Sequence, residues 1–270
     1  MSLLHIDVDS SKRSFSRLIF SMALLLVAHA AVAEPASRKG NDRLIREYSK
    51  ALASNPGQAE TYLKRGDAYL LNREFQKAID DYTKAIELND GLDQAYYGRG
   101  LALGRGGYIR EGIKDLDVYI ARNPGDSMAY TKRGVRFLWL SESKDAERNF
   151  AKAIALDPDN AEAHDDIGVI YAQRHEFAQA IEHFSTTVRL DPSYQKAFHN
   201  LAMAYYMTGQ DEAALAAVDN ALELNPQARS TLLVKSVILD TLGRVDEAKA
   251  LKEEAEFLPE GNWPEHVPVQ

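Results

Sequence analysis

The side chains best suited to metal or acid–base chemistry are His199, Asp165 and Asp166. Histidine and carboxylates bind transition metals, and a histidine beside a carboxylate can also move protons. The three residues belong to neighbouring copies of a repeat described below, whose stacking is expected to bring His199 next to the two carboxylates. This spacing is a by-product of stacking unless a further ligand joins them. We therefore expect no metal and no cofactor.

The remaining histidines are more typical of packing or of solvent-exposed segments. His164 and His183 fall on faces that pack between helices, and His175 falls in a turn. The chain also lacks a Gly-rich phosphate loop and the patterns HExxH, GxSxG and CxxC. Since catalysis needs acids, bases or nucleophiles that converge in one pocket, we expect no catalytic residues and no enzymatic activity.

Composition excludes several classes of protein. The chain has 270 residues, no cysteine and a formal net charge of −8. The absence of cysteine excludes disulfides, thiolate metal sites and a lipid-modified N-terminal cysteine. Acidic and basic residues are interspersed, and nucleic-acid binding needs a basic patch that is missing here.

Residues 1–33 have the pattern of a secretion signal. Lys12, Arg13 and Arg17 precede an apolar run over 18–33, which ends in the small-residue sequence of residues 31–33. A run of this length is short of the ~20 residues that span a bilayer. We expect cleavage after Ala33 and a periplasmic or secreted protein with no stable membrane span. The alternative is an uncleaved signal that anchors the chain in the inner membrane.

The organising feature of the chain is a 34-residue period. Prolines mark this period, because a proline ends a helix and one recurs at the same position in almost every unit. The steps are Pro56, Asp90 (in place of proline), Pro124, Pro158, Pro192 and Pro226. Each unit is predicted to contain two amphipathic helices and a turn.

Helical geometry assigns packing roles inside each unit. Positions 4, 8 and 11 share one face of the first helix, at about 100° per residue. Position 8 of the repeat is small, as in Gly66 and Gly134. Position 24 of the repeat, which falls in the second helix, is aromatic, as in Tyr82 and Phe150. A small residue facing a large one allows two helices to approach closely. Gly107, Gly209 and Gly243 fall in the turns between helices.

This pattern resembles the tetratricopeptide repeat, with an aromatic, a glycine and a tyrosine in the first helix, then Ala-x3-aromatic and proline. The resemblance implies an all-α, right-handed superhelical solenoid of antiparallel helix pairs. The predicted segments are a signal peptide (1–33), a linker (34–40), a half repeat (41–58), repeats one to five (59–92, 93–126, 127–160, 161–194, 195–228), a divergent sixth repeat or cap (229–258) and a Pro-rich tail (259–270).

One departure from the family pattern recurs in the first three repeats. Position 7 carries Arg65, Arg99 and Arg133 where leucine is usual, and position 23 carries Asp81, Asp115 and Asn149. We hypothesise that each arginine bonds across its helix pair. The alternative is that the arginine stems cover the pair while the charges stay in water.

Positions 2, 5, 9, 12 and 13 point away from the packing face of each first helix, and the resemblance places them on the concave side. We name the following set the recognition face: Leu63, Asp67, Leu70, Tyr97, Leu101, Arg105, Thr131, Val135, Trp139, Asp165, Val169, His199, Met203, Tyr206 and Met207. Aromatic residues, methionine and arginine are enriched where partners dock. The alternative is that neighbouring first helices pack through some of these residues. A carboxylate clamp is not expected, because Asn200, Lys132 and Lys196 stand apart from such a set.

These observations predict a non-catalytic scaffold or adaptor that binds another protein or peptide segment, as in envelope assembly or maturation complexes of the bacterial periplasm. No nucleic-acid partner is expected, and self-association is possible. Two alternatives are a self-assembling structural protein and a metal-binding or enzymatic accessory that uses His199 and Asp165.

Overall fold

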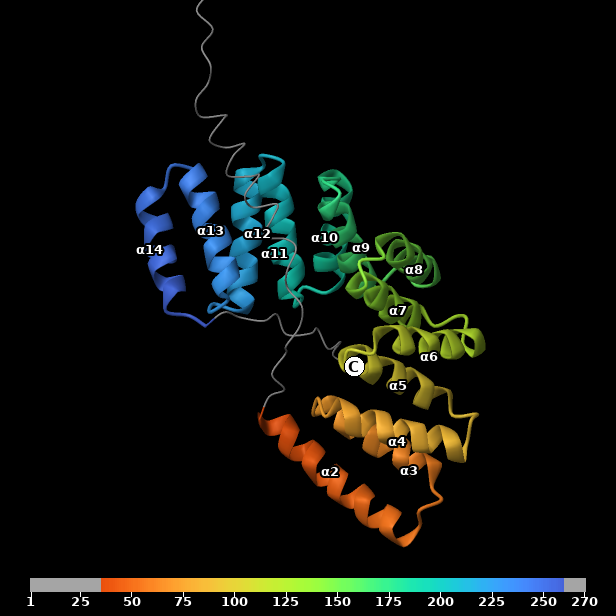
Figure 1. Ribbon diagram of the computed structural model, residues 1–270. Coiled ribbons are helices and arrows are strands. Elements are labelled where there is room, and N and C mark those ends of the chain that lie inside the picture. The colour runs from red at the N-terminus through yellow and green to blue at the C-terminus, as the bar shows by residue number, and fades with distance from the viewer. Residues whose placement is uncertain (1–34, 260–270) are drawn as a thin grey trace, which may run out of the picture. The chain divides into compact units, whose positions relative to one another are not determined.

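A computed structural model describes residues 35–259, and every described element is helical (Figure 1). The helices are α2 (Pro35–Ser54), α3 (Ala59–Leu71), α4 (Phe75–Leu88), α5 (Asp93–Arg105), α6 (Ile109–Arg122), α7 (Ser127–Trp139), α8 (Ser143–Leu156), α9 (Ala161–Gln173), α10 (Phe177–Leu190), α11 (Gln195–Met207), α12 (Asp211–Leu224), α13 (Arg229–Thr241) and α14 (Val245–Glu256). The prediction of an all-α repeat fold is confirmed. The predicted signal peptide (1–33) and residues 260–270 of the tail, with Trp263, lie outside the described residues.

The described residues form two compact units. The N-terminal unit ends at Ala163 and the C-terminal unit begins at His164. In the N-terminal unit, α3 packs on α4, α5 on α6 and α7 on α8, and each pair packs on the next. In the C-terminal unit, α11 packs on α12 and α13 on α14 in the same way. Each unit is therefore a stack of antiparallel helix pairs.

Short turns close each helix pair. The turn glycines have positive φ, with 92° at Gly107, 78° at Gly209 and 80° at Gly243. After α5, the amide of Tyr108 donates to the carbonyl of Leu103 at 2.9 Å, which satisfies a carbonyl at the helix end. The predicted role of these three glycines is confirmed. Three non-glycine residues adopt the same left-handed conformation at the equivalent turns, namely Arg73, Ser141 and His175.

The tightest packing joins a glycine of the first helix to an aromatic ring of the second. A Cβ added to Gly134 would lie 2.6 Å from Phe150 Cε1, and one added to Gly66 would lie 2.9 Å from Tyr82 Cε1. Tyr82 and Phe150 are fully buried. The fourth repeat repeats this contact between Gly168 and Phe184. The packing roles predicted for positions 8 and 24 are confirmed in these repeats.

The predicted linker over residues 34–40 is wrong, because α2 already begins at Pro35. Proline is tolerated in the first turn of a helix, where its missing N–H has no intrahelical partner. Asn41 and Asp42 lie inside this helix and bond to Asn72, which follows the last residue of α3. The Asn41 amide donates to Asn72 Oδ1 at 3.1 Å, and the Asn72 amide donates to Asp42 Oδ1 at 2.8 Å.

The position-7 arginines bond across their helix pairs, as hypothesised. Arg65 donates to both carboxylate oxygens of Asp81 at 2.7 Å, and Arg99 does the same to Asp115 at 2.6 and 2.8 Å. In the third repeat, Arg133 Nε donates to Asn149 Oδ1 at 2.8 Å. The alternative, in which the charges stay in water, is wrong for these arginines. The hydrogen bond to Asp81 raises the pKa of Arg65.

Each of these arginines also reaches the preceding helix, which the sequence analysis did not predict. The Nη1 atoms donate to residues 16 positions earlier, at distances of 3.0, 3.2 and 2.6 Å. The acceptors are Ser49, Thr83 and Asp117. The arginine therefore ties its own two helices to their predecessor. Lys235 in the sixth repeat makes the equivalent backward contact, 2.8 Å from Asp219.

We predict that a double-mutant cycle on Arg65→Met and Asp81→Asn gives a coupling free energy of about 1–3 kcal/mol in denaturant unfolding. Both side chains are largely removed from solvent and the contact is bidentate, so its loss leaves a desolvated partner. The exposed pair Arg43 and Glu47 on α2 is the control and should show no measurable coupling. Additive effects at Arg65 and Asp81 would contradict the bridge.

Candidate functional site

The recognition face differs between the two units. In the N-terminal unit, Asp67 is exposed and Thr131 is fully buried, while the other members are half-buried. These half-buried members are Leu63, Leu70, Tyr97, Leu101, Arg105, Val135 and Trp139. Most of the predicted residues in this unit thus keep part of their surface accessible.

Trp139, at the end of α7, is held in a specific arrangement with Arg136 and Gly104. The Arg136 guanidinium carbon lies 4.7 Å from the centroid of the Trp139 ring, within cation–π range. The same guanidinium donates to the carbonyls of Lys132 at 3.2 Å and of Leu101 at 3.3 Å. A Cβ on Gly104 would lie 2.7 Å from Arg136 Nε and 3.3 Å from Trp139 Cζ3. Glycine at this position on α5 therefore makes room for the stacked pair.

Arg136 is a residue that the sequence analysis missed. It lies at position 10 of the third repeat, outside the positions assigned to the recognition face, and only 2 % of it is exposed. A signal was present, because Gly104 occupies position 12, where the first and third repeats carry larger residues. A small residue there leaves room for a side chain from the next first helix to cross over it.

Tyr97, on α5, packs against Tyr119 of α6 at a ring-centroid distance of 5.0 Å. Burial raises the pKa of the Tyr97 phenol. The Tyr119 hydroxyl donates to Asp126 Oδ2 at 2.7 Å, and burial together with this bond raises the pKa of Tyr119 to about 12. Both phenols therefore stay neutral at ordinary pH, and Tyr97 offers an aromatic surface rather than an acid or base.

Thr131 has a structural role. Its hydroxyl donates to the carbonyl of Ser127 at 3.2 Å and accepts a bond from the Asn160 amide at 3.0 Å. Asn160 also binds Ser127 Oγ at 2.6 Å and accepts from the backbone of Ala163 at 2.9 Å. This residue of the recognition face is thus engaged within the N-terminal unit.

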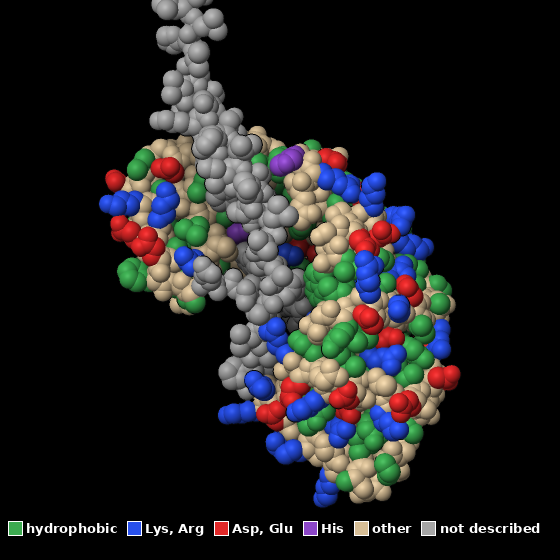
Figure 2. All heavy atoms as spheres, viewed as in Figure 1, with side chains coloured by type: hydrophobic (Ala, Val, Ile, Leu, Met, Phe, Trp, Pro, Cys, Tyr) green, Lys and Arg blue, Asp and Glu red, His purple; other side chains and the backbone are tan. Residues whose placement is uncertain are grey.

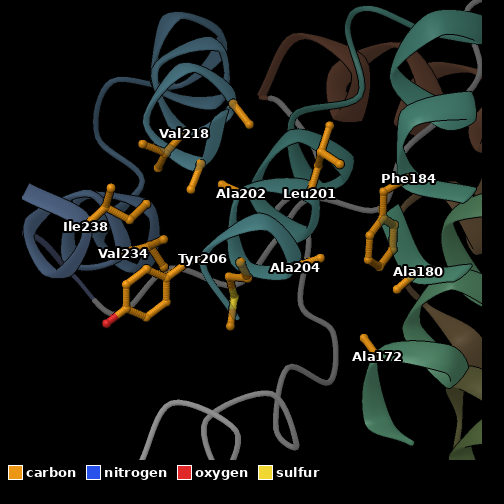
Figure 3. Packing of buried hydrophobic residues seen from close by; sticks show 13 residues of the cluster. Ala172, Ala180, Phe184, Leu201, Ala202, Ala204, Tyr206, Val218, Val234 and Ile238 are labelled. Carbon is orange, nitrogen blue, oxygen red and sulfur yellow. The ribbon is translucent and has the colours of Figure 1, made fainter. Parts of the chain in front are cut away.

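In the C-terminal unit, packing between neighbouring first helices covers several predicted residues. Met203 and Tyr206 are 7 % and 1 % exposed and lie in a core cluster with Val234 and Ile238 of α13, as Figure 3 shows for the labelled Tyr206. The Tyr206 hydroxyl lies 3.3 Å from Thr241 Oγ1. Val169 and Met207 pack against the same cluster and are half-buried. Here the alternative interpretation, packing through the predicted face, describes the structure.

The polar members of the face in this unit bond to neighbouring side chains. Asp165 is fully buried and lies 2.9 Å from Lys196 Nζ, and it accepts a bond from the Asn200 amide at 3.0 Å. His199 instead contacts Thr231, with 3.1 Å between Nδ1 and Oγ1. Within residues 35–259, no group of three or more His, Cys, Asp or Glu side chains could hold a metal ion. The predicted proximity of His199 to Asp165 therefore does not build a metal centre in the described part of the chain.

The lysines and the asparagine considered for a carboxylate clamp are also engaged. Lys132 Nζ lies 2.6 Å from both carboxylate oxygens of Glu162 on the N-terminal unit. Lys196 and Asn200 bind Asp165 in the C-terminal unit, as described above. Over the face shown in Figure 2, lysine, arginine, aspartate and glutamate side chains are interspersed, as the sequence led us to expect. None of the described helices is both long enough and apolar enough to cross a membrane.

Models of the tetratricopeptide repeat match residues 59–91, 131–195 and 171–237. No curated protein matches the chain. Solved structures similar to it include that of YrrB, described as a TPR protein with an unusual peptide-binding site, at 23 % identity over 68 % of this chain and 95 % of that one, with a TM-score of 0.51. Pseudomonas aeruginosa pilF aligns at 17 % identity over 72 % and 88 % of the two chains, with a TM-score of 0.66.

A third similar structure is the APC/C hetero-tetramer Cut9–Hcn1, at 17 % identity and a TM-score of 0.65. The alignment covers 80 % of this chain and 45 % of that one, so the present chain spans less than half of that protein. At these identities the likeness concerns the fold.

We predict that acidification destabilises the C-terminal unit through His199. Burial, and then the charge of Lys196, lower the pKa of His199 to about 4, whereas an unfolded histidine titrates near 6.5. The unfolded state therefore binds the proton first, and the stabilisation present above pH 6.5 is lost as the pH falls towards 4. Between pH 7.5 and pH 5 the unfolding free energy should fall by about 2 kcal/mol from this group.

The measurement is denaturant-dependent hydrogen exchange of α11 and α13 at the two pH values. His199→Asn should remove most of this pH dependence. His175→Asn, at an exposed turn position with positive φ that asparagine tolerates, is the matched control and should keep it. An equal loss in wild type and His199→Asn would show that His199 does not carry the effect.

Proposed function

Because the chain belongs to the tetratricopeptide repeat family, we propose that it is a non-catalytic scaffold that binds a segment of another protein along its recognition face. Proteins of this family generally serve as protein-interaction modules. The similar structure of YrrB is described by its peptide-binding site, and Cut9 forms an assembly with Hcn1. Both support a binding role for a chain of this fold.

The observation that carries the proposal is the half-buried apolar surface on the first helices of the N-terminal unit. Leu101 on α5 and Val135 and Trp139 on α7 keep exposed area, although a helix in a soluble protein usually has only one apolar stripe. The first helices of this unit already use another apolar stripe to pack on the second helices of their repeats. A second, partly accessible apolar stripe is typical of a surface that a partner covers.

The chemistry of this surface defines the partner that we propose. Trp139 and Tyr97 offer aromatic surfaces, and Leu101 offers an aliphatic one. Leu63 and Leu70 pack in part against the core cluster of the first repeat and add only their remaining exposed area. Aromatic anchors supply most of the binding energy at protein interfaces. The partner is therefore a peptide segment that presents apolar side chains, and the N-terminal unit is its main binding site. In the C-terminal unit, Met203 and Tyr206 are used for packing instead.

We further propose that the scaffold acts in the periplasm, in an envelope assembly or maturation complex. The support is the sequence of residues 1–33, with its basic residues, its apolar run and the Ala31-Val32-Ala33 ending. The absence of cysteine agrees with a protein that carries no lipid on an N-terminal cysteine.

We predict that Trp139→Ala weakens partner binding by at least about 30-fold, which corresponds to the loss of one aromatic hot spot of ~2 kcal/mol. A photo-crosslinking amino acid at Leu101 in living cells should join the chain to its partner, and the Trp139→Ala change should abolish the product. Tyr108→Ala is the control, because Tyr108 is exposed in the turn before α6 and lies outside the recognition face.

Circular dichroism should show that both variants keep their helicity. Undiminished crosslinking in Trp139→Ala, with the protein folded, would count against binding at this surface.

We predict that the mature chain begins at Glu34. Mass spectrometry of its N-terminus after cell fractionation should find this residue in the soluble periplasmic fraction. Ala33→Leu places a large residue at the cleavage site and should leave an uncleaved, membrane-associated precursor. Recovery of the wild-type chain from the cytoplasm with an intact N-terminus would refute export.

A further inference from the structure

The fourth repeat holds its two helices together with a pair of histidines. His164 lies at position 4, where the first three repeats carry tyrosine, and His183 lies at position 23, where they carry aspartate or asparagine. Position 7 is Ile167, which is 4 % exposed, so the bridging arginine is absent from this repeat. The histidine pair therefore takes the place of the arginine bridge between the helices.

The geometry shows a direct hydrogen bond between the two imidazole rings. The Nδ1 atoms lie 2.9 Å apart, and the ring centroids lie 5.1 Å apart. His164 is 8 % exposed and His183 is half-buried. Tyr171 of α9 stacks on His183, with centroids 5.5 Å apart and an interplanar angle of 8°. The rings are thus confined between α9 and α10 in this orientation.

A hydrogen bond between two imidazole nitrogens imposes a condition on protonation. One Nδ1 must carry a hydrogen and the other must keep its lone pair. Addition of one proton to the donor ring preserves the bond and makes it charge-assisted. Addition of a second proton places hydrogens on both Nδ1 atoms, which then face each other on two positive rings. The bond cannot exist in that state.

The charged groups around the pair come from three helices. On α9, Asp165 and Asp166 follow His164 directly, and from α11 Lys196 lies 2.9 Å from Asp165 and 3.9 Å from Asp166. Burial, and then the charge of His164, lower the pKa of His183, and the carboxylate of Glu182 on α10 acts in the opposite direction.

We propose that the His164–His183 pair is a pH-sensitive latch that closes α9 on α10 near neutral pH and opens when acidification protonates both rings. The arginine bridges of the first two repeats contain no imidazole, and their arginines keep a permanent positive charge over this range. Of the side-chain bridges that join the two helices within a repeat, acidification therefore weakens the one in the fourth repeat and not those of the first two. The export proposed above would expose the protein to such changes, because the pH of the periplasm changes with the pH of the medium.

The direction of the pH effect follows from the linkage between proton binding and folding. A histidine whose pKa is lowered by folding stabilises the folded state above the unfolded pKa of about 6.5, and this stabilisation is lost as the pH falls below it. Each pKa unit of lowering makes opening about tenfold more favourable at low pH. The two rings titrate as a coupled pair, in two macroscopic steps.

The test compares the wild-type full chain with a variant that carries His164→Tyr, Ile167→Arg and His183→Asp, the residues of the first repeat at these positions. Hydrogen exchange of α9 and α10 is measured at pH 7.5 and pH 5 and corrected for the intrinsic exchange rate. The opening equilibrium of the wild type should rise about tenfold on acidification. The variant should lack this tenfold difference and keep at these helices only the part of the rise that His199 causes. Both chains keep His199, so its contribution cancels in the comparison.

Equal rises in the two chains, or no rise in the wild type, would overturn the latch. Nitrogen NMR of the wild-type histidine rings tests the proposal independently if the variant does not fold. It should show one Nδ1-protonated neutral ring at pH 7.5 and two titration steps separated by more than about one pH unit. Two rings that titrate independently near 6.5 would also overturn the proposal.

Discussion

The contact on which the structure depends is the close approach of the two helices within each repeat. In the first, third and fourth repeats, an aromatic ring from the second helix lies directly on the glycine at position 8 of the first helix, as Phe150 does at Gly134. No side chain fits between them, so the distance and register of the helix pair are set by this contact. In the second repeat the two helices also approach closely, but there Gly100 packs on the backbone of Gly112 and not on an aromatic ring. Because this spacing is similar from repeat to repeat, each helix pair can pack on the next in a similar way.

Polar side chains form a second layer that joins consecutive pairs. The arginine of each early repeat divides its donors between its own second helix and the helix that precedes the repeat, as Arg99 does between Asp115 and Thr83. A planar guanidinium has enough fixed donors to serve both. In the fourth repeat, where isoleucine replaces arginine, an imidazole pair supplies the bond instead. The bond between the two helices of a repeat thus comes from a permanently charged arginine in the early repeats and from a titratable histidine pair in the fourth.

The two units use their first helices differently. In the C-terminal unit, Tyr206 and Met203 fill the space between α11 and α13, and His199 reaches Thr231 on α13. In the N-terminal unit, Gly104 instead admits the stacked Arg136 and Trp139, and Tyr97 and Leu101 remain half-buried. A residue that seals neighbouring repeats is not available to a partner. The recognition face therefore keeps more accessible surface in the N-terminal unit than in the C-terminal unit.

The sequence by itself determined the repeat, the helix pairs and the glycine–aromatic contacts, because these depend on residues a fixed distance apart within one unit. It also predicted the Arg65–Asp81 bond, which spans a single helix pair. It did not predict that α2 begins at Pro35, that Arg136 covers Gly104, or that Tyr206 is buried while Trp139 is not. The last two outcomes depend on how one repeat packs on the next. The side chains involved are about 35 residues apart, and their contact is decided only when the stack forms, by the volumes that meet there.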